Sequence, residues 1–224
     1  MKRKPRLSNT TQKSIVVLIS GRGSNMQALF DAELPGGRIS AVISNRADAP
    51  GLTIAEHFGV ETHVVSHLDY PDRLSFDLAL ASILDGYHPD LIVLAGFMRI
   101  LTPEFVSRYK GMLINIHPSL LPAYGGLDTH GRALRDGVKV HGCTVHFVST
   151  DLDHGPVIIQ SAVPVLWNDT PETLAERVLR EEHRIYPQAV RWFCSDRLSL
   201  SENGRVLLSR YEQPGAALVS PGLE

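Results

Sequence analysis

Unbroken apolar runs constrain the fold of this chain more than any other feature. Residues 15–19 (IVVLI) and 91–95 (LIVLA) contain no polar side chain. Such runs predict strands of a parallel sheet that are buried on both faces. Segments 39–44 and 62–65 predict two more strands, and segments with helical spacing separate all four. Alternation of this kind is typical of an α/β protein.

The rhythm changes in the second half of the chain. Residues 142–148 and 156–165 both show strand-like alternation, and only residues 149–155 separate them. This pattern predicts an antiparallel hairpin. We therefore expect a Rossmann-like, mostly parallel central sheet with helices on both faces and an appended antiparallel hairpin.

Two helix starts carry a recognisable signal. Thr102 before Pro103 predicts a short helix, and Thr170 before Pro171 predicts a long one that reaches about residue 193. Pro187 predicts a kink or a break in the long helix, because proline removes a hydrogen bond of the helix interior.

The length of 224 residues suits one domain with tails. We predict a basic disordered tail over residues 1–13, a domain over residues 14–194, and a C-terminal surface segment with a strand pair and a tail over residues 195–224. The formal net charge of −2 favours neither nucleic acid nor membrane as a partner. The N-terminus lacks the pattern of a signal peptide, and the two cysteines lack metal or redox spacing, so we expect a cytoplasmic protein.

Asn115 and His117 are the strongest candidates for chemistry. They lie two residues apart in an otherwise apolar run that Pro118 ends, so both side chains would project from one face of a strand. An amide can donate to a developing oxyanion while an imidazole moves a proton. The alternative is a core pair that merely satisfies its own hydrogen bonds.

A glycine-rich turn follows the first apolar run. Residues 21–25 (GRGSN) would join this strand to a helix, where free backbone N–H groups favour an anion such as phosphate. Position 26 is methionine, so the dinucleotide fingerprint is incomplete. A plain strand–helix turn remains the alternative.

The hairpin loop adds a carboxylate. If the loop folds over the Asn115/His117 strand, Asp153 could meet His117 and favour its charged form. Residues 96–101 follow the run at 91–95, at the edge of the sheet where α/β proteins bind ligands. The ten histidines lack the spacing of known metal motifs, so we expect no metal.

Taken together, these motifs resemble the phosphoribosylglycinamide formyltransferase family, folate-dependent enzymes of purine synthesis. The resemblance covers about residues 15–193. It rests on the segments VVLISGRGSN, SNRADAPGL, LAGFMRIL, NIHPSLLP, HGCTVHFV and DLDHGPVIIQ. One departure is Gly125-Gly126, where the family usually has Pro-Gly, so we expect a looser loop there.

The resemblance implies a role for each matching residue. Asn115, His117 and Asp153 would be catalytic. Residues for the substrate phosphate and ribose would be Gly23, Ser24, Asn25 and Glu182. Residues for the folate would be Arg73, Met98, Arg99, Ile100, Leu101, Asn115, Ser149, Thr150, Asp151, Leu152 and Asp153.

The implied reaction passes the formyl group of 10-formyltetrahydrofolate, a co-substrate, to the amine of glycinamide ribonucleotide, with no metal. The implied enzyme acts on small molecules as a monomer or homodimer. One alternative is formyltetrahydrofolate deformylase, which passes the formyl group to water. That family carries a regulatory domain before the catalytic one, and only thirteen residues precede the first strand here. The other alternative is a non-catalytic module that binds a phosphate ligand.

Overall fold

The computed structural model describes residues 12–201, 203–210, 218 and 220. Apart from Gln12 and Lys13, the predicted basic tail lies outside these residues, and Lys13 already belongs to the first strand. Most of the predicted C-terminal tail after residue 210 also lies outside them. No helix in the described part of the chain is long and apolar enough to cross a membrane.

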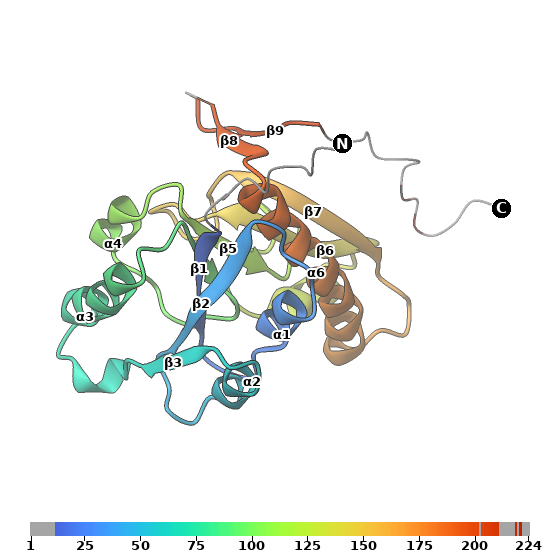
Figure 1. Ribbon diagram of the computed structural model, residues 1–224. Helices are drawn as coiled ribbons and strands as arrows, with labels where there is room; N and C mark the ends of the chain where they lie inside the picture. Colours follow the sequence, from blue (N-terminus) through green and yellow to red (C-terminus); the bar gives the residue numbers. More distant parts are fainter. Residues whose placement is uncertain (1–11, 202, 211–217, 219, 221–224) are drawn as a thin grey trace, which may run out of the picture.

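Seven strands form the central sheet in the order β3-β2-β1-β4-β5-β6-β7 (Figure 1). The strands are β1 Lys13–Ile19, β2 Gly37–Ser44, β3 Glu61–Val64, β4 Leu91–Leu94, β5 Leu113–His117, β6 Val140–Phe147 and β7 Val157–Pro164. The first five are parallel, whereas β6 is antiparallel to β5 and β7 is antiparallel to β6. The predicted mixed sheet with its appended hairpin is therefore confirmed.

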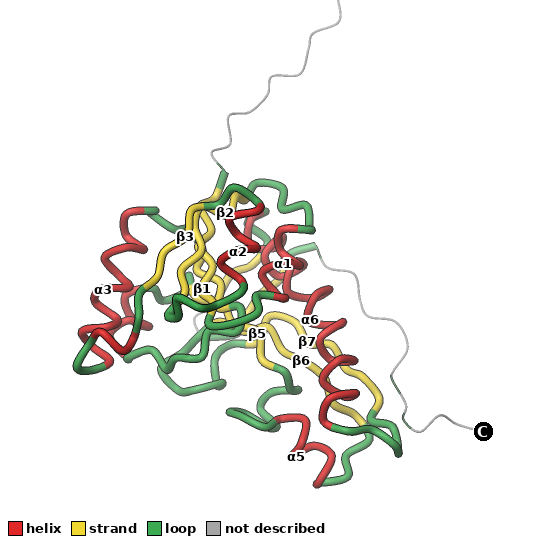
Figure 2. Tube along the Cα trace, turned by 90° about the horizontal axis from the view of Figure 1, so that it is seen from below, coloured by secondary structure: helices red, strands yellow, loops and turns green. Residues whose placement is uncertain are grey.

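Helices cover both faces of the sheet, and they separate clearly when the sheet is viewed along its edge (Figure 2). On one face lie α1 Ser24–Phe30, α2 Gly51–His57 and α6 Pro171–Cys194, and on the other lie α3 Arg73–Gly86 and α4 Pro103–Arg108. Both predicted caps are present: Thr102 accepts from the backbone N–H of Phe105, and Thr170 forms a capping box with Thr173. Helix α6 continues through Pro187 without a break.

Two short helices were not predicted from the sequence. A 3₁₀ helix, η1, spans His67–Asp69, and α5 spans Thr129–Arg135 and packs against α6. The predicted surface strand pair is present as β8 Leu198–Leu200 and β9 Val206–Leu208, which form a separate antiparallel sheet.

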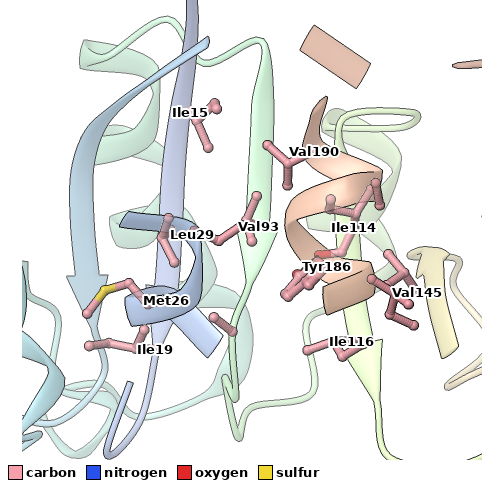
Figure 3. Packing of buried hydrophobic residues seen from close by; sticks show 14 of the residues in the cluster. Ile15, Ile19, Met26, Leu29, Val93, Ile114, Ile116, Val145, Tyr186 and Val190 are labelled. Atoms are coloured by element: carbon pink, nitrogen blue, oxygen red, sulfur yellow. Dashed lines mark hydrogen bonds between the residues drawn. The ribbon is translucent and has the colours of Figure 1, made fainter. Parts of the chain in front are cut away.

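Each face of the sheet has its own hydrophobic core, because the central strands alternate their side chains between the two faces. On the α6 side, Ile114 and Val93 pack against Tyr186 and Val190 of the helix (Figure 3). Tyr186 is fully buried, and its hydroxyl lies 2.9 Å from the carbonyl oxygen of Leu94 and 3.2 Å from that of Ile114. This hydroxyl therefore ties α6 to the backbone of both β4 and β5.

The order of the strands creates a crevice beside β1. This strand pairs with β2 on one side and β4 on the other. At the carboxyl edge, the connection after β1 leads to α1 on one face of the sheet, and the connection after β4 leads to α4 on the other face. Open α/β sheets bind ligands at such a switch point. Strand β5 reaches farther than β4, since Leu94 pairs with Asn115 and His117 lies two residues beyond.

Candidate functional site

A cavity of about 230 Å³ occupies the carboxyl edge at the switch point, and its lining includes all of residues 20–25 together with Ala95, Gly96 and Met98. Gly23 has a φ of 76° and precedes the first turn of α1. A Cβ atom there would lie 2.9 Å from the Cα atom of Gly51. Both the backbone angle and the contact therefore require glycine. The predicted glycine turn opens a helix, as an anion site needs.

Asn25 and Glu182 meet behind this loop. The Nδ2 atom of Asn25 donates a 2.7 Å hydrogen bond to Oε2 of Glu182, and both residues are buried. Burial raises the pKa of Glu182, while the bond from Asn25 acts in the opposite direction. The candidate phosphate and ribose residues, which lie far apart in the sequence, thus form one cluster, and Ser24 lies half-buried at its mouth.

Ser20 also belongs to this region, although the sequence pattern did not predict a role for it. Its hydroxyl donates to Oδ1 of Asn45 over 2.5 Å and accepts from the backbone N–H of Met98 over 2.7 Å. The end of β1 therefore fixes the start of the candidate folate segment, residues 98–101. A small polar residue after a buried strand was the available signal.

Asn115 and His117 project from the face of the sheet that α3 and α4 cover, because the alternate residues Ile114 and Ile116 belong to the core on the other face. Across the β5–β6 ladder, Asn115 pairs with His146. The predicted side-by-side arrangement on one strand is therefore present, and the two side chains do not hydrogen-bond to each other.

Asp153 reaches His117 from the loop between β6 and β7. Its Oδ2 atom lies 3.6 Å from Nδ1 of His117, and both side chains are more than nine-tenths buried. The other ring nitrogen, Nε2, lies 3.1 Å from the carbonyl oxygen of Tyr124. A carbonyl only accepts, so Nε2 carries a proton. An oxygen atom thus faces each ring nitrogen of His117.

Backbone groups hold Asp153 in place. Its Oδ2 atom accepts a 2.7 Å hydrogen bond from the backbone N–H of Gly126. Gly126 has a φ of 78°, and a Cβ atom at neighbouring Gly125 would lie in ordinary contact with the Asp153 side chain, 3.6 Å from its Cβ atom. The Gly125-Gly126 segment, expected to form a looser loop, thus contacts the candidate carboxylate directly. The Tyr124 carbonyl and the Gly126 amide gave no signal in the sequence, because every residue type has these groups.

The remaining folate candidates surround this edge without forming one contact network. Met98, Ile100 and Leu152 are exposed apolar side chains, which a flat apolar ligand could cover. Arg73 lies at the first turn of α3, and its charge and that of Arg99 act against the rise that burial causes in the pKa of Asp77. The other candidates, Leu101, Ser149, Thr150 and Asp151, lie half-buried or exposed in the two loops.

A family model described as formyl transferase matches residues 13–190, most of the chain. The chain belongs to the formyl transferase family. Phosphoribosylglycinamide formyltransferase of Escherichia coli is 50% identical to this formyl transferase over 193 residues, which are 85% of this chain and 91% of that protein. The human trifunctional purine biosynthetic protein adenosine-3 is 47% identical over 86% of this chain, which spans only 19% of that longer protein.

Solved structures of formyl transferases have the same fold. Phosphoribosylglycinamide formyltransferase from Coxiella burnetii superposes on this formyl transferase with a TM-score of 0.84 at 50% identity, over 88% of this chain and 93% of that one. A formyltetrahydrofolate deformylase from Pseudomonas syringae has a TM-score of 0.81 at 27% identity, over 88% of this chain and 66% of that one. The fold is thus common to both enzyme types, while the sequence is much nearer to the transferases.

Proposed function

We propose that this formyl transferase moves the formyl group of 10-formyltetrahydrofolate to the amine of 5′-phosphoribosylglycinamide, as a step of purine biosynthesis in the cytoplasm. The observation that carries the proposal is the approach of Asp153 to His117 beside Asn115, at the same edge of the sheet as the glycine turn. An acid, an amide donor and an anion site then lie along one edge of the sheet, which suits a phosphorylated amine acceptor and a formyl donor.

The three side chains divide the chemistry between them. The acceptor amine attacks the formyl carbon, and the carbonyl oxygen becomes an oxyanion. The Nδ2 group of Asn115 and the Nε2–H of His117 stabilise this charge. Nε2 is the available ring donor, because Nδ1 faces Asp153, and the oxyanion takes the place of the Tyr124 carbonyl as its acceptor.

Asp153 stabilises the charged imidazole through its carboxylate. Collapse of the tetrahedral intermediate breaks the bond between carbon and N10, and a proton from the attacking amine passes to N10. The products are the formylated glycinamide and tetrahydrofolate, so atoms and charge balance.

Gly23, Ser24 and Asn25 would bind the phosphate through the start of α1, and Glu182 would accept from the ribose hydroxyls. On the folate side, the exposed apolar residues Met98 and Ile100 would cover the pterin ring, and Arg73 would meet the glutamate carboxylates. Arg99, Leu101 and residues 149–152 would complete the folate pocket.

The test is a spectrophotometric assay with 10-formyl-5,8-dideazafolate, with and without the ribonucleotide. We expect deformylation of the folate that requires the ribonucleotide and yields a formylated product. His117→Asn should abolish it, whereas His57→Asn, a change at an exposed histidine of α2, should not. Deformylation at the same rate without the ribonucleotide would assign the hydrolase reaction, and an active His117→Asn variant would contradict the mechanism.

A further inference from the structure

One buried histidine contacts the candidate site from the neighbouring strand. The Nε2 atom of His146 on β6 lies 3.3 Å from Nδ2 of Asn115, its cross-strand partner on β5. The other ring nitrogen, Nδ1, lies 2.9 Å from the carbonyl oxygen of Phe147. His146 is only 2% exposed, and Asn115 is half-buried, so the contact with Phe147 is buried and the contact with Asn115 is partly buried.

These two contacts determine the tautomer of His146. A carbonyl oxygen accepts and never donates, so the proton of the ring lies on Nδ1. Nε2 of the neutral ring then has only a lone pair, and it accepts from the amide of Asn115. Consequently the NH₂ group of Asn115 points toward β6, and its oxygen points away. The second N–H of the same amide stays available to a developing oxyanion.

The neutral ring is favoured by its surroundings. Burial lowers the pKa of His146, and the charge of His117 acts in the same direction. The Phe147 carbonyl and Asp153 act in the opposite direction but more weakly than burial. A protonated ring would present an N–H to the amide N–H₂ of Asn115, and two donors cannot share a hydrogen bond.

Gly155 fixes the carbonyl that selects this tautomer. A Cβ atom at Gly155 would lie 1.7 Å from the carbonyl oxygen of Phe147, a distance that no side chain allows. The register of the β6–β7 ladder shifts between Val145 and His146, where the partner strand passes from Ile159 to Val157. A side chain at position 155 would therefore displace the carbonyl that contacts Nδ1 of His146.

We propose that His146 is a positioning residue that holds the amide of Asn115 with its NH₂ group toward the reacting oxygen. This inference rests on the proposed function, in which Asn115 donates to the oxyanion. The chain of contacts runs from Gly155 to the Phe147 carbonyl, through the ring of His146, to the Asn115 amide. His146 itself touches no substrate in this assignment.

The first test measures the wild-type ring and uses a variant of His146 only to assign its signals. Two-bond ¹H–¹⁵N correlation spectra of the histidine rings, at pH 7.5, report which nitrogen of each ring is protonated, and loss of one signal set in His146→Gln assigns it. We expect His146 as the neutral Nδ1–H tautomer. A ring protonated at Nε2, alone or at both nitrogens, would overturn the proposal, because Asn115 could then present only its oxygen to His146.

The second test compares two amide substitutions. Glutamine places an acceptor oxygen near the position of Nε2, whereas asparagine is too short to reach Asn115. We expect His146→Asn to lower kcat about 10- to 100-fold, which does not exceed the effect of removing an oxyanion donor altogether. The KM values for both substrates should stay within about threefold of the wild-type values. His146→Gln should recover most of this loss. Equal activity of the two variants, or a rise in KM with kcat unchanged, would contradict the proposal.

A double-mutant cycle completes the test. If His146 acts through Asn115, then His146→Asn should have almost no effect on kcat in an Asn115→Ala background, because coupled residues are non-additive. Multiplicative losses would contradict the proposal. An inactive wild-type protein would instead contradict the proposed function, while the tautomer measurement would still report on His146, so the two failures are distinguishable.

Discussion

The side-chain amide of Asn25 donates a 2.7 Å hydrogen bond to the buried carboxyl group of Glu182. One residue belongs to the first turn of α1 and the other to the middle of α6, so this bond joins the two helices beneath the candidate phosphate turn. Any ligand that binds Glu182 therefore reaches a carboxyl group whose orientation Asn25 already determines.

Asn25→Ala should weaken both stability and nucleotide binding. The change leaves Glu182 buried without its donor, and an unsatisfied buried polar group costs about 1–3 kcal/mol. We expect a loss of this size in urea unfolding and a rise in KM for the ribonucleotide without a matching rise for the folate. Gln27→Ala, which removes only an exposed bond to Asp31, is the control. An unchanged KM would argue against the phosphate assignment.

Asp153→Asn should lower turnover about 100-fold or more, because the neutral amide no longer stabilises the imidazolium of His117. Stability should change little. The amide oxygen of asparagine can still accept from the backbone N–H of Gly126. Steady-state kinetics together with the melting temperature separate the two effects. Turnover near the wild-type value would be incompatible with the proposed role.

Acid should destabilise the protein through His141. This residue is 1% exposed, and burial lowers its pKa from 6.5 to about 4. The unfolded chain thus binds a proton near pH 6.5, and the folded chain does so only near pH 4. The contribution of neutral His141 to the free energy of unfolding is therefore present in full above pH 6.5. As the pH falls toward 4, this free energy decreases by up to about 3 kcal/mol.

The measurement is the free energy of unfolding in urea at pH 7.5 and pH 5. His141→Gln should reduce the difference between the two values, although half-buried His130 and buried His146, whose pKa values burial also lowers, contribute in the same direction. Exposed His57, changed to glutamine, serves as the control. An unaltered difference in His141→Gln would refute the assignment of the acid sensitivity to this ring.

Asp169→Asn should destabilise the start of α6. Arg177 donates two hydrogen bonds to Asp169, over 2.6 and 2.8 Å, and the aspartate side chain is 3% exposed. These bonds lower the pKa of Asp169 to about 2. Loss of the charge leaves the guanidinium of Arg177 without a counter-charge, although its bond to the carbonyl of Pro164 remains, and we expect a cost of about 2–4 kcal/mol. Thermal and urea unfolding should both report it, and a cost below about 0.5 kcal/mol would contradict this reasoning.

Much of the fold was predictable because the strands are buried on both faces. The apolar runs at residues 15–19 of β1 and 91–94 of β4 indicated the central position of these strands, and the caps at Thr102 and Thr170 marked the starts of α4 and α6. Helix α5 was missed for an equally physical reason. It has seven residues, and Asp128 at its N-cap has a φ of 52° and makes no side-chain cap, so tertiary packing on α6 stabilises it rather than local signals.

The candidate site was only partly predictable. The spacing of Asn115 and His117 predicted a shared face, and their meeting with Asp153 required the path of the hairpin loop, which sequence patterns do not specify. Val148 donates to the carbonyl of Leu113 at the start of β5, and the loop then folds back over the sheet to reach His117. The expected effect of Pro187 on α6 was wrong in one respect. A break was one expectation, yet the buried neighbours Tyr186 and Val190 hold the helix in place.

The hydroxyl of Tyr186 has a consequence for cooperativity. It binds the backbone of β4 and β5 one residue before Ala95 and Asn115, so α6 cannot separate from the sheet while both segments keep their bonds. Amide hydrogen exchange should therefore find β4, β5 and α6 opening as one unit with a single free energy. Ligand binding at either end of the crevice would then slow exchange throughout that unit, far from the atoms that the ligand touches.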